Sequence, residues 1–92
     1  MIAVTTHGHC GRIPIGFDIS RGRIYSTGGS FAFYPIRLGG RVSGGGHVSL
    51  KAIAGPRIAH GSGKFTRVQG GGKWSGTGPS GRCSGYWRAE RY

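Results

Sequence analysis

Apolar residues alternate with polar or small residues in several short segments of this chain. Between positions 12 and 19, Ile13, Ile15, Phe17 and Ile19 take every second place. A period of two is that of a β-strand with one face turned inward and the other outward. No window of a dozen residues has apolar residues three and four apart without a Gly or Pro between them, so helices are not expected. The pattern predicts an all-β chain.

Glycine and proline mark where the predicted strands end. Pro14 places its segment at a sheet edge or at a strand end, and Pro35 is expected to bend or divide the segment around it. Turns are expected at residues 20–22, 28–29, 44–46, 55–56 and 69–71. The strands predicted between them are residues 12–19, 23–27, 31–42, 47–54, 57–66, 72–78 and 81–91.

The alternation also predicts which side chains face the interior. Ile58 falls on the opposite face of its segment from the predicted inner residues. The predicted inner residues are Ile36, Leu38, Gly40, Val42, Val48, Leu50, Ala52, Ala54, Ala59, Gly61, Gly63, Phe65, Cys83, Gly85, Trp87 and Ala89. Large and small side chains would interdigitate inside, with Gly opposite Trp. We predict one domain over residues 1–92: an antiparallel up-and-down meander of about seven or eight strands, closed or nearly closed into a small barrel.

Composition adds that the core is thin. A chain of 92 residues buries only about 60 to 65% of the surface that its unfolded form exposes, so an additional covalent staple is expected. Glycine supplies 21 residues without a Gly-X-Y period, and 36% of residues are hydrophobic, which excludes collagen.

The charge is strongly positive. Thirteen Lys and Arg face only Asp18 and Glu90, for a formal net charge of +11. Such a surface attracts any polyanion, whether nucleic acid, anionic lipid or acidic polysaccharide. No run of 18 apolar residues is present, so no transmembrane helix is expected.

The same scarcity of carboxylates argues against catalysis. General acid-base chemistry usually needs paired carboxylates or a carboxylate beside a histidine, and Glu90 sits between Arg88 and Arg91. The Gly-Ser-Gly-Lys stretch at residues 61–64 lacks the spacing of a phosphate-binding loop. We predict a protein that is not an enzyme and that uses no cofactor.

Several stretches, among them "GRIYSTGGSF", "GGRVSGGGHVSL" and the ending "GGGKWSGTGPSGRCSGYWRAERY", resemble a family of small β-rich proteins of alphaproteobacteria. These are secreted or periplasmic proteins of unknown function, sometimes labelled as exoproteins for heme utilization or adhesion. The resemblance covers the chain from about Val4 onward and is most specific in the Gly-x-Trp-x-Gly and Cys-x-Gly-x-Trp-x-Ala-x-Arg ending.

The resemblance implies a periplasmic or secreted location. Family members usually carry a signal peptide and an extra Asp-Gly-x-Trp strand before the first cysteine, and neither is seen here. If Met1 is the native start, the expected location is the cytoplasm instead. The apolar stretch at residues 1–4 is too short for the core of a signal peptide.

The resemblance also implies a disulfide between Cys10 and Cys83. A bridge over so long a loop contributes about 4 to 5 kcal/mol in the chain-entropy model. Two alternatives stay open: free thiols, or a metal or heme site at "HGHC", where His7 and His9 are weak candidate ligands. On a strand these two histidines would share one side, and Cys10 would point away from them.

The functional hypothesis that follows is a non-catalytic, exported binding module. It would act as an accessory subunit of an envelope complex, or as an adhesion-like module on such a complex or on an anionic surface. The proposed binding residues are Phe31, Phe33, Tyr34, Arg37 and Arg41, in and after the most apolar candidate for a surface segment. Ordinary core packing is the alternative for the aromatic run at residues 31–36. The alternative is a basic nucleic-acid-binding barrel, whose arginines contact phosphates and whose aromatic residues stack on bases.

Overall fold

A computed structural model describes residues 1–79 and 81–90, which form eleven strands. They are β1 (Ile2–His7), β2 (Arg12–Pro14), β3 (Gly16–Ser20), β4 (Arg23–Gly28), β5 (Ser30–Phe31), β6 (Tyr34–Pro35), β7 (Arg37–Val42), β8 (His47–Ala54), β9 (Arg57–Phe65), β10 (Gln69–Gly78) and β11 (Gly81–Glu90).

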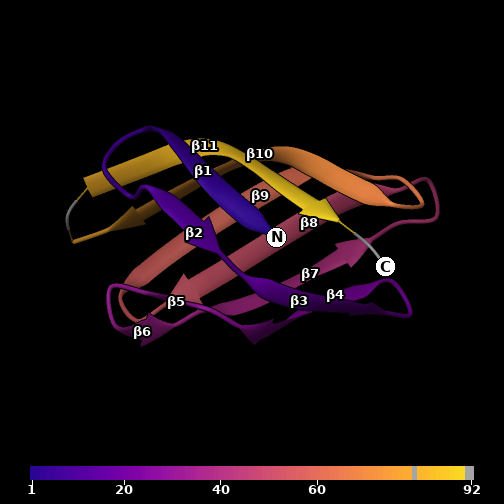
Figure 1. Cartoon of the computed structure of the whole chain (residues 1–92), viewed down its shortest axis with the longest axis horizontal. Helices are drawn as coiled ribbons and strands as arrows, with labels where there is room; N and C mark the ends of the chain where they lie inside the picture. The colour runs from indigo at the N-terminus through magenta and orange to yellow at the C-terminus, as the bar shows by residue number, and fades with distance from the viewer. Residues whose placement is uncertain (80, 91–92) are drawn as a thin grey trace.

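Nine of these strands form one antiparallel sheet that is nearly closed into a barrel. Its order is β2-β1-β11-β10-β9-β8-β7-β4-β3, and β5 pairs with β6 in a separate hairpin. The two outermost strands, β2 and β3, are consecutive in the chain and are separated only by Ile15 (Figure 1). At this seam the Ile15 amide donates to the Met1 carbonyl at 2.7 Å, and the Met1 amino group donates to the Ile15 carbonyl at 3.0 Å. Burial lowers the pKa of that amino group, and the nearby Glu90 carboxylate acts against the shift.

The all-β antiparallel fold is confirmed, but the expected strand count is too low. Pro14 ends β2, so the segment predicted at residues 12–19 is two strands. Pro35 ends β6, and the segment predicted at residues 31–42 contains β5, β6 and β7. An additional strand, β1, precedes the first predicted one. The expected turn at residues 69–71 is also wrong, because β10 begins at Gln69 and pairs there with β11.

The β5–β6 hairpin lies in the connection between the paired strands β4 and β7, at one end of the barrel (Figure 1, left). The Ile36 amide donates to the Gly29 carbonyl at 3.0 Å and closes its base. Its two turn residues, Ala32 and Phe33, have φ of 50° and 71°. Positive φ at both central positions is the geometry of a tight hairpin turn, and it is uncommon for residues other than Gly, Asn and Asp.

The core follows the predicted alternation. Buried residues come from the expected inner faces: Ile36, Leu38, Val48, Leu50, Ala54, Phe65, Trp87 and Ala89, with Ile15 and Ile24 beside them. Trp87 is 2% exposed, and its ring lies 5.7 Å from that of Phe65. Phe65 in turn lies 6.0 Å from Phe17 on β3. This aromatic cluster therefore joins three distant strands inside the barrel.

Candidate functional site

The "HGHC" stretch is a turn that positions a half-cystine. Cys10 forms a disulfide with Cys83 on β11, with the two Cα atoms 6.1 Å apart. Gly8 and Gly11 flank it with φ of 100° and 69°, a region that L side chains rarely adopt. A Cβ at Gly8 would overlap the carbonyl oxygen of Arg82. The turn therefore requires glycine at Gly8 in order to approach β11 and form the bridge.

The histidines beside this turn are on the surface. His7 and His9 are both exposed, and the Nδ1 atom of His7 lies 3.2 Å from the Thr6 hydroxyl. Within residues 1–79 and 81–90, no three His, Cys, Asp or Glu side chains are grouped as a metal site would need. Because the disulfide occupies Cys10 and Cys83, neither sulfur is a thiolate ligand.

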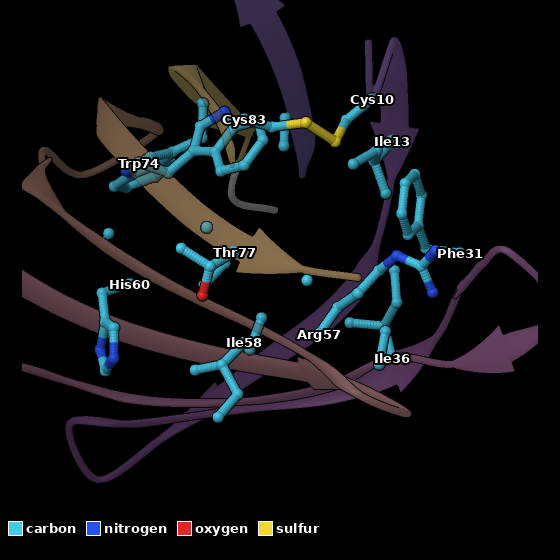
Figure 2. A pocket seen from close by; sticks show the side chains of 18 of the residues that line it. Cys10, Ile13, Phe31, Ile36, Arg57, Ile58, His60, Trp74, Thr77 and Cys83 are labelled. Atoms are coloured by element: carbon cyan, nitrogen blue, oxygen red, sulfur yellow. A yellow bond between two sulfur atoms is a disulfide. The ribbon is translucent and has the colours of Figure 1, made fainter. Parts of the chain in front are cut away.

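A cavity of about 200 Å³ lies inside the end of the barrel that carries the disulfide. Its walls include Ile13, Ile36, Leu50, Trp74 and the Cys10–Cys83 bridge, and Figure 2 shows several of these side chains around the space. The cavity is partly open to solvent, and its lining is mostly carbon.

Small residues on the inner faces create this space. Ala52, Ala59, Gly61 and Gly76 line it from β8, β9 and β10. Large side chains such as those of the Phe17–Phe65–Trp87 cluster fill the remainder of the interior. The barrel is therefore packed over part of its length and hollow at one end.

Arg57 is one of the basic residues that line this hollow end. It is two positions before Ala59 on β9, so the period of two assigns it to the inner face. Its guanidinium carbon lies 5.3 Å from the ring centroid of Phe31, a cation–π arrangement that Figure 2 shows beside Ile36. The side chain passes beside Gly78, where a Cβ would meet the Arg57 Cγ atom.

Sequence reasoning did not identify this cavity or Arg57. The sequence does contain a pattern that points to Arg57, because this cation falls at a predicted inner position, in phase with Ala59, Gly61 and Gly63. The size of the cavity depends on which small residues face one another across β8, β9 and β10, and that requires the strand register.

The predicted binding residues are divided between the interior and the surface. Phe31 is half-buried and packs against the core, whereas Phe33 at the hairpin tip is fully exposed and Tyr34 is 44% exposed. Arg37 and Arg41 are exposed on β7. The structure therefore brings Phe33 and Tyr34 together at one end but places Phe31 in the wall of the cavity.

Two further apolar side chains are exposed near Tyr34. Ile53 and Ile58 face each other across the β8–β9 hairpin and are both exposed. The Tyr34 ring lies against Gly55 in the turn of that hairpin. Arg37 is paired with Ile53 in the β7–β8 ladder, so a cation borders this apolar group. We call Phe33, Tyr34, Ile53 and Ile58 the hairpin patch.

Like charges also face each other on the outside of the barrel. Arg23 and Arg41 are directly paired between β4 and β7, and both are exposed. Like charges at such positions repel and destabilise the pair. A bound anion would relieve that repulsion.

No helix in residues 1–79 or 81–90 has the length and apolarity needed to cross a membrane. Comparisons of the chain with protein-family models, curated proteins and solved structures find no match. The resemblance to the family of small β-rich alphaproteobacterial proteins therefore stays a prediction.

Proposed function

We propose that the protein is a non-catalytic binding module that attaches to an anionic lipid surface of the cell envelope. The end of the barrel that carries the β5–β6 hairpin makes the contact. The observation that carries this proposal is the full exposure of Phe33 at the tip of a hairpin whose turn residues both have positive φ. A large aromatic side chain fixed in water on a constrained turn suits insertion into an apolar layer.

The rest of the hairpin patch supports insertion to interfacial depth. Ile53 and Ile58 supply aliphatic surface, and Tyr34 supplies a ring with a polar end. Aromatic side chains of this amphipathic kind are favoured at the level of lipid headgroups. Transfer of a phenylalanine side chain from water into an apolar layer contributes about 1.5 to 3 kcal/mol.

The charge determines which lipid surface is favoured. Arg37 borders the hairpin patch, and the chain as a whole carries a formal net charge of +11. Each Lys or Arg held near an anionic leaflet contributes about 1 kcal/mol of attraction, which salt screens. Anionic lipid is therefore expected to bind far more strongly than neutral lipid.

The test is cosedimentation with vesicles of phosphatidylcholine, with and without phosphatidylglycerol. We expect binding to the anionic vesicles only, and we expect Phe33→Ser to weaken it by about tenfold or more, since the substitution removes the apolar transfer term. Val68→Ser is the matched control, because Val68 is 65% exposed in the β9–β10 loop at the other end of the barrel. Its vesicle binding should equal that of the unmodified chain.

Two outcomes would contradict the proposal. Equal loss for Phe33→Ser and Val68→Ser would remove the hairpin patch from the contact. Tight binding to single-stranded oligonucleotides without binding to anionic vesicles would favour the nucleic-acid alternative, and that binding should fall steeply with salt.

A further inference from the structure

We infer that the cavity binds one hydrocarbon chain that ends in a carboxylate, the chemical class of the medium-chain fatty acids. This goes beyond the proposed attachment to lipid surfaces, because the ligand is a single free molecule held inside the barrel. Three properties of the cavity lead to this class: its size, its apolar walls and the sign of the charge at its rim.

The size limits the ligand to one chain or one ring. Apolar cavities of about 150 Å³ in proteins bind a molecule such as benzene, and this one is about 200 Å³. A chain of about eight carbons fits that space if its polar end remains at the opening. A complete phospholipid with two long chains does not fit.

The walls favour hydrocarbon. Ile13, Ile36, Leu50 and Trp74 surround the space from four different strands or connections, and the disulfide closes another side. Filling such a space with hydrocarbon restores dispersion contacts that the small inner residues leave unmade. The expected contribution rises with each methylene group of the ligand.

The charge at the rim selects an anion. Four basic residues, His9, Arg57, His60 and Arg82, are among the lining residues, and neither Asp18 nor Glu90 is. Arg57 is on the inner face, next to Phe31 and Ile36 (Figure 2). A guanidinium in mostly apolar surroundings binds a carboxylate through charge-assisted, often bidentate hydrogen bonds. The carboxylate is therefore placed at Arg57 and the chain between Leu50 and Trp74.

The opening of the cavity permits entry without unfolding. The space is already partly open to solvent. A free chain can therefore enter with no strand pair of the barrel separated.

The test is calorimetric titration with octanoate in lipid-free buffer, with 1-octanol as the uncharged probe of equal chain length. We expect saturable one-to-one binding of octanoate and binding of 1-octanol weaker by about tenfold, the difference of one charge-assisted interaction. Arg57→Gln should weaken the binding of octanoate by a similar factor and leave the binding of 1-octanol unchanged. Arg67→Gln in the distant β9–β10 loop is the matched control and should change neither.

A second pair of variants tests the cavity itself. Ala59→Leu and Ala52→Leu each fill the space from a different strand, and each should abolish octanoate binding while the circular dichroism spectrum is preserved. Using two variants keeps the test decisive if one of them misfolds. The inference is overturned if the unmodified chain shows no saturable octanoate binding, or if a folded filling variant binds as well as it does. The titration contains no lipid surface, and the vesicle assay contains no octanoate. The proposed ligand binding and the proposed attachment to lipid surfaces can therefore fail independently.

Discussion

The indole nitrogen of Trp87 donates a hydrogen bond to the carbonyl oxygen of Ser62 at a distance of 3.1 Å. Trp87 is paired with Gly72 on β10, and Gly72 is paired with Gly63 on β9. Because neither glycine has a side chain, the indole can lie across β10 and reach the backbone of β9. One large side chain thus covers two strands of a thin core.

Truncation of the Trp87 side chain should destabilise the fold severely. We expect Trp87→Ala to lower the free energy of unfolding by about 3 to 5 kcal/mol, because it leaves a cavity and removes the hydrogen bond to Ser62. Domains of this size have a total stability of about 5 to 15 kcal/mol, so the variant should be only marginally folded at room temperature. Urea unfolding followed by circular dichroism measures the change. The neighbouring Tyr86→Ala, on the exposed face of β11, should cost no more than about 1 kcal/mol.

A methyl group at Gly72 should destabilise the fold. A Cβ there would overlap the backbone carbonyl oxygen of Ser62, which cannot move without disrupting the β9–β10 ladder. We expect Gly72→Ala to cost about 1 to 3 kcal/mol or more. Gly39→Ala is the matched comparison, because no atom lies within 4 Å of a Cβ at that strand position. Its melting temperature should be unchanged or slightly raised, and equal losses in both variants would refute this account.

Removal of the disulfide should be costly but should not prevent strand formation. The bridge joins residues 73 apart in sequence, and the chain-entropy model assigns such a loop about 4 to 5 kcal/mol. We expect the double variant Cys10→Ser, Cys83→Ser to lose about 2 to 5 kcal/mol in urea unfolding. Reductant should destabilise the unmodified chain to a similar extent and leave the double variant unchanged. If reductant affects both chains equally, the effect does not come from this bridge.

Replacement of a buried hydroxyl should stabilise the fold. The Thr5 Oγ1 atom is buried and has no hydrogen-bond partner among residues 1–79 and 81–90. Thr5→Val keeps the shape and removes the desolvated polar group, so we expect a gain of about 1 kcal/mol in the free energy of unfolding. The exposed Thr6→Val, next in the chain, is the control and should show no gain. A loss for Thr5→Val would indicate that the hydroxyl is satisfied in solution.

The sequence was sufficient to predict the strand faces, because the period of two survives even where glycine replaces large residues. Val48, Leu50 and Ala54 are buried on one side of β8 as expected. The ends of strands were harder to place. At Gln69, three following glycines resemble a turn, but Gly70 allows β10 to lie against the Phe65 ring, and Gly71 and Gly72 pair with Arg88 and Trp87 on β11. Local propensity favours a turn there, and tertiary packing overrides it.

The candidate site was only partly predictable for a related reason. A run of apolar residues between glycines marked Phe31 and Phe33 together as surface candidates, with core packing as the alternative, and it could not separate the half-buried Phe31 from the exposed Phe33. Which of the two faces the interior depends on the turn at residues 32–33, where two residues other than glycine adopt positive φ. Composition and periodicity do not predict that conformation.

The pairing of β1 with β11 has a consequence for how the chain assembles. Strands β7 to β10 each pair with the next strand in the chain, so each new strand can join as soon as it leaves the ribosome or a translocation channel. Strand β1 can pair early with β2, but its other edge must wait until β11 appears, at a sequence separation of about eighty residues, as the pairing of Ala3 with Trp87 shows. Closure of the ring and sulfur bridging are therefore late events. Until then the growing chain exposes an unpaired sheet edge. We expect a chaperone or a thiol oxidoreductase to bind the chain at this stage.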